Sequence, residues 1–130
     1  MRSKIHFITG RTGWKEKKRM AQSFYVSLSP HDAEARIHAA VVGGSVTGEE
    51  IDRFMLDGPD GKVCLVSIYE KHFWRAGNRL TLTVTVDNLQ GRTRVHLVSG
   101  GGGEGLFRFD WGASESFESC AIDALAPFRL

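Results

Sequence analysis

A strict alternation of apolar and polar residues is the clearest pattern in the second half of the chain. In the run 79–87 the apolar positions are Leu80, Leu82, Val84 and Val86, separated by threonines and charged residues. The run 92–98 alternates in the same way around Val95 and Leu97. A period of two is typical of strands. Two such neighbours predict an antiparallel sheet with one covered face and one wet face.

Further strands are expected on both sides of this pair. The β-branched and aromatic runs 23–28, 62–74 and 106–111 predict three of them. The segment 45–56 has two readings, because Thr47 and Glu50 fit a helical capping box while Gly48 falls in the first turn of that helix. We favour a strand there, followed by a hairpin turn in the sequence DGPDG.

Two helices are expected. The first spans 30–42, with Ser29 as N-cap, a proline at the first helical position and Gly43-Gly44 as the C-terminal stop. The second closes the chain, with Ser114 as its cap and Pro127 at its end. Both carry an apolar stripe with helical spacing.

The predicted order is β-α-β-β-β-β-β-α, an α+β fold with a single antiparallel sheet and two helices on one face. This order resembles the topology of the TATA-box-binding protein and of the START-like helix-grip. The likeness concerns the fold and implies no function.

The stretch 99–109, SGGGGEGLFRF, satisfies G-x-G-x-x-G at Gly100, Gly102 and Gly105. A phosphate-binding loop of this kind follows a strand and opens a helix. Here the residues that follow, 106–111, have the period of a strand. We therefore interpret the glycines as a hairpin connection between two strands.

Charge is concentrated at the N-terminus. Residues 1–19 contain seven of the 17 basic residues and one of the 15 acidic ones, and so carry +6, whereas 20–130, with ten basic and 14 acidic residues, carries −4. We expect one domain over 20–130. For the leader we hypothesise that translation starts at Met20; a phosphate-binding basic arm and a disordered tail are the alternatives.

The expected location is the cytoplasm. The chain contains no apolar run long enough to span a bilayer, and its N-terminus lacks the apolar core of a signal peptide. Cys64 and Cys120 show no metal-type spacing, and we expect two reduced thiols.

The candidate functional surface is the wet face of the sheet, where basic and aromatic residues are interleaved. Its candidate residues are Tyr69, Glu70, His72, Trp74, Arg79, Arg92, Arg94, His96 and Arg108. The favoured function is a non-enzymatic binding or assembly module that self-associates or docks a protein partner. Single-stranded nucleic acid is an alternative ligand for the same face. An ordinary solvated face, with cross-strand pairs such as Asp87 with Arg92 or Arg94, explains the same residues.

Catalysis is not favoured. Glu70 and His72 share a strand face, but no nucleophile accompanies them, and the histidines show no metal-ligand spacing. We expect no cofactor and no metal. A second alternative function is an apolar ligand held between sheet and helices, although Phe107, Phe109, Trp111, Phe117 and Phe128 are also what a domain of this size needs for its core.

Three short motifs carry a resemblance to a known family. They are Tyr69-Glu70-Lys71, then Gly77-Asn78-Arg79-Leu80, then Val98-Ser99-Gly100-Gly101 before Phe107. The chain is similar over about 20–130 to a bacterial family of small uncharacterised proteins, a domain of unknown function. The resemblance implies no activity and no catalytic residue.

Overall fold

The computed structural model describes residues 21–44, 48–73, 78–102 and 111–130. Its elements in chain order are β1 (Ala21–Val26), α2 (Pro30–Gly43), β2 (Glu49–Asp57), the 3-10 turn η2 (Pro59–Gly61), β3 (Val63–Phe73), β4 (Asn78–Asp87), β5 (Thr93–Gly102), α3 (Trp111–Leu125) and the 3-10 turn η4 (Ala126–Phe128).

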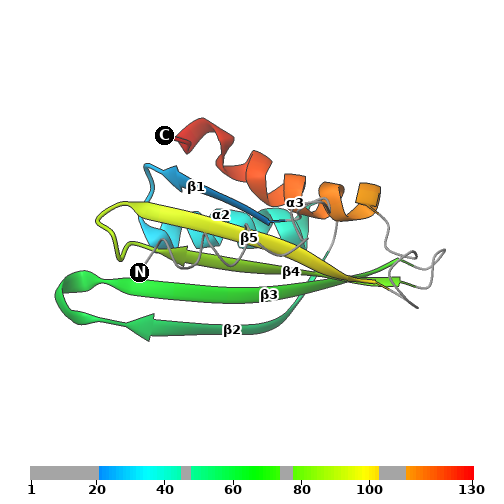
Figure 1. Ribbon diagram of the computed structural model, residues 1–130, viewed down its shortest axis with the longest axis horizontal. Coiled ribbons are helices and arrows are strands. Elements are labelled where there is room, and N and C mark those ends of the chain that lie inside the picture. The colour runs from blue at the N-terminus through cyan, green and yellow to red at the C-terminus, as the bar shows by residue number, and fades with distance from the viewer. Residues whose placement is uncertain (1–20, 45–47, 74–77, 103–110) are drawn as a thin grey trace, which may run out of the picture.

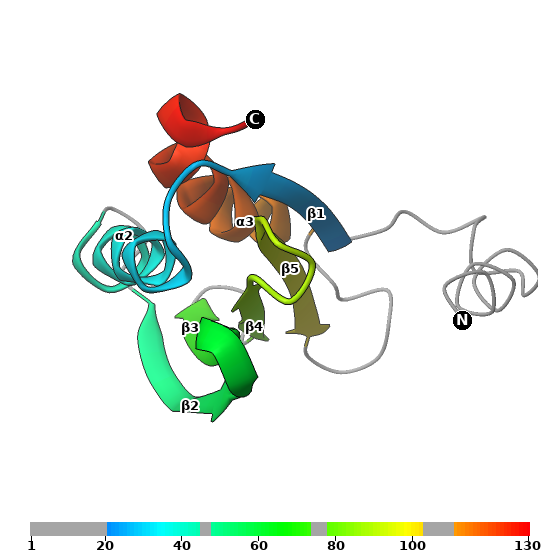
Figure 2. The same ribbon diagram turned by 90° about the vertical axis from the view of Figure 1, so that its left-hand side faces the viewer.

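The strands form one five-stranded antiparallel sheet in the order β1-β5-β4-β3-β2. Both helices lie on the same side of this sheet, and no described helix or strand covers the other side, which we call the open face (Figures 1 and 2). The predicted α+β class, with a single antiparallel sheet and two helices on one face, is confirmed. Strand β2 forms one edge of the sheet and β1 forms the other.

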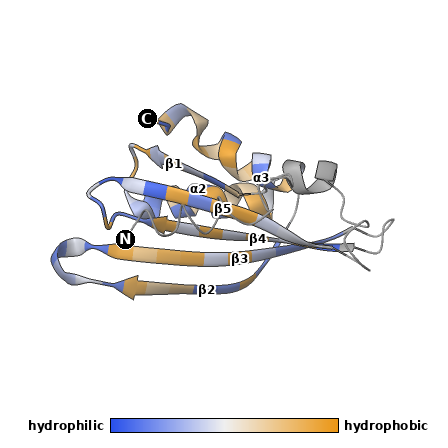
Figure 3. Cartoon of the chain, in the orientation of Figure 1, coloured by the Kyte–Doolittle hydropathy of each residue, from blue (hydrophilic) through white to orange (hydrophobic). Residues whose placement is uncertain are grey.

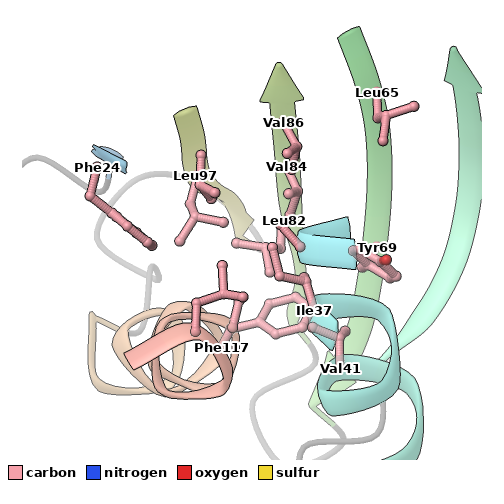
Figure 4. Close-up of a cluster of buried hydrophobic side chains, with 14 of the residues drawn as sticks. Phe24, Ile37, Val41, Leu65, Tyr69, Leu82, Val84, Val86, Leu97 and Phe117 are labelled. Atoms are coloured by element: carbon pink, nitrogen blue, oxygen red, sulfur yellow. The ribbon is translucent and has the colours of Figure 1, made fainter. Parts of the chain in front are cut away.

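The core lies between the helices and the sheet. The alternating residues of β4 all point into it, and Leu80, Leu82 and Val86 are fully buried. They meet Ile37 of α2 and Phe117 of α3, both also fully buried (Figure 4). The regular alternation of β4 therefore predicts its buried face correctly.

Helix α2 begins as its sequence predicts. The Ser29 hydroxyl accepts a hydrogen bond of 3.2 Å from the backbone N–H of Asp32, which is an N-cap, and Pro30 occupies the first turn. The two glycines 43 and 44 end the helix. The segment expected as a strand at 45–56 contains β2, and the DGPDG turn contains η2.

The C-terminal region differs from expectation. The strand expected over 106–111 lies outside the described residues except for Trp111, which is the first residue of α3. Ser114 lies inside α3 and so is not its N-cap. Pro127 follows the helix as expected, within η4.

The first glycines of the glycine-rich stretch belong to a strand and not to a loop. Gly100 and Gly102 pair with Thr81 and Arg79 in the ladder between β5 and β4. Gly101 has a φ of 110°, and a Cβ at this position would lie 2.5 Å from the carbonyl oxygen of Arg79. Only glycine fits this close approach. The interpretation of the glycines as a hairpin connection is therefore wrong for Gly100, Gly101 and Gly102, which belong to β5.

The remaining global expectations concern the leader, the thiols and membranes. The leader 1–19 lies outside the described residues. Cys64 and Cys120 are thiols and form no disulfide, as expected. In the part of the chain that the structure describes, neither helix is long and apolar enough to cross a membrane.

Candidate functional site

The open face of the sheet is defined by the side chains that alternate with the core. On β3 these are Cys64, Val66, Ile68, Glu70 and His72. Their neighbours on β4 are Asp87, Thr85, Thr83, Thr81 and Arg79, in the same order. Neither described helix lies on this side of the sheet (Figure 2).

Five of the nine candidate residues lie together on the open face. They are Glu70, His72, Arg79, Arg94 and His96. Arg92 lies in the turn just before β5. Trp74 and Arg108 lie outside the described residues.

Tyr69 lies on the other face. It is fully buried among the core side chains beside α2 (Figure 4). Its neighbours in the ladder are Leu82 of β4 and Glu50 of β2. Tyr69 is therefore not part of the open face, because β3 turns its odd-numbered residues toward the helices.

The described arginines of this surface interact with neighbouring side chains. Arg94 donates from Nε and Nη2 to Oδ2 of Asp87, at 3.2 and 3.1 Å, and this carboxylate is 2% exposed. The predicted cross-strand pair is thus Asp87 with Arg94. Arg79 lies 3.6 Å from the Glu70 carboxylate. The guanidinium of Arg92 stacks over the ring of Tyr25 at 3.9 Å.

An apolar strip occupies the β2 side of the open face. We define it as Phe54 and Leu56 of β2 with Val66 and Ile68 of β3. Phe54 lies opposite Val66, and Leu56 lies opposite Cys64. Phe54 and Leu56 are 46% and 58% exposed. Figure 3 shows this end of the two strands as a hydrophobic segment. The open face therefore combines a paired polar half with an exposed apolar half.

A polar recess lies on the other side of β2, against α2. Its centre is Glu34, whose side chain is 5% exposed and accepts from Nε and Nη2 of Arg53 at 2.6 and 2.7 Å. The buried Ser67 hydroxyl donates to the same carboxylate at 2.9 Å. The hydrogen bonds from Arg53 are the main reason why the pKa of Glu34 lies below its usual range.

His38 and Glu50 complete the recess. Nδ1 of His38 lies 3.2 Å from the Tyr69 hydroxyl and 3.5 Å from the Glu50 carboxylate. Burial raises the pKa of Tyr69 to about 12. The recess has a volume of about 290 Å³ and is lined by Glu34, Ala35, His38, Glu50 and Arg53.

Glu34 and Tyr69 of the recess each have one stable protonation state at neutral pH. Glu34 is held as an anion by three donated hydrogen bonds, and Tyr69 keeps its proton at neutral pH. A general acid or base needs a pKa near the working pH, and neither group has one. Among the described residues there is also no group of three side chains suited to hold a metal ion. The recess joins α2 to β2 and β3.

Local sequence patterns did not point to the recess. The sequence shows Glu34 only as a favourable acid in the first turn of a helix. Its partner Arg53 lies 19 positions away, in a segment whose pattern fits both a strand and a helix. One sequence feature could have revealed the recess, namely an acidic residue on the apolar side of the first helix. Glu34 lies there between Ala33 and Ile37, which are both fully buried. A carboxylate in such a position requires a cationic partner.

Comparison with families of known sequences gives a single finding. Residues 20–129 match the family of unknown function DUF6054. No curated protein and no solved structure matches the chain. The matched region covers most of the chain, including every described strand and helix and the open face. The chain therefore belongs to DUF6054, a family of unknown function.

Proposed function

We propose that the protein is a non-enzymatic binding or assembly module that contacts a protein partner through the open face of its sheet. The observation that supports this most directly is the apolar strip, where Phe54 and Leu56 are about half exposed on a face that no helix covers. Contiguous apolar surface on a small domain is typical of interaction sites.

The two halves of the open face have different roles in this proposal. The apolar strip gains free energy when it is removed from water, at about 25 cal/mol per Å². In the polar half, the charges of Asp87 and Arg94 and those of Glu70 and Arg79 are already paired with each other. A partner can therefore lie against this half without leaving a charge unpaired, and the polar half forms the rim of the interface. Binding is then centred on β2 and β3.

Nucleic acid is the weaker alternative for the same face. A single-strand platform needs cations that neutralise phosphates and rings on which bases stack. Arg94 and Arg79 contact carboxylates, and the ring of Tyr25 is already stacked by Arg92. We expect no salt-dependent change in the fluorescence anisotropy of labelled single-stranded RNA or DNA with the full chain. Tight binding that weakens with salt would favour the alternative.

An apolar ligand between sheet and helices is also less favoured. Phe117, Leu82 and Leu97 fill the space between the layers and are fully buried (Figure 4). A fluorescent apolar probe is expected to stay dark with a folded Phe54→Ser/Leu56→Ser variant, in which the exposed apolar strip no longer offers a binding surface. Strong emission from this variant would favour a ligand cavity. Five aromatic residues were expected to line such a cavity or to fill the core. The side chains of three of them, Phe107, Phe109 and Trp111, lie outside the described part of the structure.

The test of the proposal is site-specific photo-crosslinking in the cells that produce the protein. A photo-reactive amino acid is placed at Ile68 on the apolar strip or at Thr83 beside it, and Ala39, exposed on α2, is the matched control. The proposal predicts a defined adduct from positions 68 and 83 and none from position 39. Adducts of equal yield at all three positions, or from position 39 alone, would contradict it.

A further inference from the structure

Strand β2 is an open edge with an unusual apolar content. All nine of its residues are exposed, and Ile51 and Met55 are 51% and 48% exposed in addition to the two apolar residues on the open face. At the opposite edge, the C-terminal residues cover part of β1, since Val26 bridges to Arg129 and the Leu130 N–H donates to the Tyr25 carbonyl. A long apolar edge strand is a template for pairing with another strand.

The hydrogen-bond pattern shows which backbone groups of β2 point outward. The Gly58 N–H donates to the Lys62 carbonyl at 2.8 Å, so this pair is bonded across the hairpin between β2 and β3. Val63, which lies opposite Asp57, instead directs its carbonyl and its N–H to Asn88, so the Asp57–Val63 pair is a non-bonded one. Bonded and non-bonded pairs alternate along an antiparallel ladder. This alternation directs the backbone groups of Arg53, Met55 and Asp57 away from β3. No described strand of the chain pairs with those outward groups, and a strand of a second molecule can do so.

We propose that β2 pairs antiparallel with β2 of a second copy of the chain, with Met55 opposite the partner's Met55. In this register Arg53 lies opposite the partner's Asp57, and the two-fold symmetry repeats this ion pair. Phe54 lies opposite the partner's Leu56, also twice. Each outward backbone pair exchanges two hydrogen bonds.

Neighbouring registers lose these matches. If Phe54 were the central residue, Arg53 would lie opposite the partner's Met55, and Asp52 opposite the partner's Leu56. If Leu56 were central, Met55 would lie opposite the partner's Asp57. Cross-strand pairs of opposite charge or of two apolar side chains each stabilise a sheet by about 0.2 to 1 kcal/mol relative to alanine. The sequence of β2 therefore selects the Met55 register.

The proposed pairing is compatible with the rest of the fold. Arg53 uses Nε and Nη2 for Glu34, and a guanidinium has five N–H donors, so it can also contact the partner's Asp57. The ladder ends near Gly58, because Pro59 lacks an N–H and begins η2. The acidic residues Glu49 and Glu50 then lie beyond the paired segment.

The second copy extends the sheet and brings two apolar strips together on one open face. The contact nevertheless forms along the β2 edge, and Phe54 and Leu56 are the residues of the open face that it involves. The pairing is therefore separable from the proposed function. A chain whose β2 edge does not pair can still bind a partner through its open face, and a dimer can form through β2 without a partner on the open face.

Sedimentation velocity of the full chain, from micromolar to millimolar concentration, tests the pairing. The wild type is expected to form a concentration-dependent dimer. Met55→Pro removes an outward N–H without removing a bond to β3, and should raise the dimer dissociation constant by about tenfold or more. Val42→Lys, at a site on α2 that is 38% exposed, is the control that should leave the constant unchanged.

Circular dichroism establishes that each variant is folded. If Met55→Pro is unfolded, Met55→Lys replaces it, since an edge lysine also blocks strand pairing. A wild type that stays monomeric to millimolar concentration would overturn the proposal. So would a dimer that persists undiminished in the folded Met55 variant.

The register has a test of its own. Residues of a hydrogen-bonded antiparallel pair have Cα atoms about 5.5 Å apart, within the range of a disulfide. Oxidation should therefore cross-link Met55→Cys to its symmetry mate faster than Leu56→Cys, whose mate lies further along the ladder. Both variants also carry Cys64→Ser, because Cys64 lies opposite position 56 and would form an intrachain disulfide with a cysteine there. The Cys64→Ser protein, which retains Cys120, reports the background. Equal or faster cross-linking of Leu56→Cys would overturn the proposed register.

Discussion

The Arg53 guanidinium of β2 donates two parallel hydrogen bonds to the Glu34 carboxylate of α2, at 2.6 and 2.7 Å. The carboxylate is almost completely buried, while about half of the arginine side chain is exposed. This pair attaches the outermost strand to a helix. It therefore holds in place the strand that carries half of the apolar strip.

Replacement of Glu34 by glutamine should destabilise the fold by about 1 to 3 kcal/mol, because charge-assisted hydrogen bonds are lost inside the protein. Urea unfolding at neutral pH measures the change in the free energy of unfolding. Glu49→Gln, on the exposed start of β2, is the control and should change stability by less than about 0.5 kcal/mol. Equal effects of the two substitutions would show that the Glu34–Arg53 pair does not stabilise the fold.

The contribution of Glu34 should depend on pH. Its pKa in the folded protein is lowered from 4.5, so its stabilisation is fully present above pH 4.5 and is lost as the pH falls through the folded pKa. The stability difference between wild type and Glu34→Gln should therefore shrink in acidic buffers below pH 4.5. A difference that stays constant over this range would argue against an ionised, hydrogen-bonded Glu34.

Asp87→Asn should destabilise the protein by about 1 to 3 kcal/mol, because the buried carboxylate that accepts two bonds from Arg94 becomes neutral. Thermal unfolding gives the comparison. Asp60→Asn is the matched control, since Asp60 is exposed and has a φ of 57°, which asparagine also tolerates. A melting temperature lowered as much by the control would count against the Asp87–Arg94 pair.

Gly101→Ala should destabilise the fold by more than about 1 kcal/mol, because alanine is strained at positive φ and its Cβ would press on the Arg79 carbonyl. Gly43→Ala is the contrasting substitution. It lies at the end of α2 with no atom within 4 Å of the added carbon, and its effect should be small. Chemical denaturation measures the free energy of unfolding of both variants. Similar values for the two would contradict the close approach of β5 to β4.

The sequence predicts the fold well where one pattern decides a segment. In β4 every second residue is apolar, so the buried face follows directly. In β3, Val66 and Ile68 are as apolar as Leu65, and Tyr69 is amphipathic, so the run has no readable phase. This explains why Tyr69 was expected on the open face. Only pairing with β4, which places Tyr69 beside Leu82, determines its side.

The candidate site was predictable only in part, for a related reason. The places of Arg79, Arg94 and His96 follow from the alternation of β4 and β5, and the Asp87–Arg94 pair follows from the short hairpin between these strands. The apolar strip and the polar recess depend instead on how β2 lies against β3 and α2. These are long-range contacts, and no local spacing reveals them.

Thiol labelling of the unmodified protein tests the central proposal most directly. Cys64 lies on the open face between Leu56 and Asp87, whereas Cys120 of α3 donates to the Ala40 carbonyl at 3.1 Å on the helical side. Burial raises the pKa of both thiols, so both react slowly and can be compared. If a partner covers the open face, Cys64 should be labelled several-fold more slowly in intact cells than in dilute purified protein, with the rate at Cys120 unchanged. Equal labelling of Cys64 in both settings would contradict the proposal.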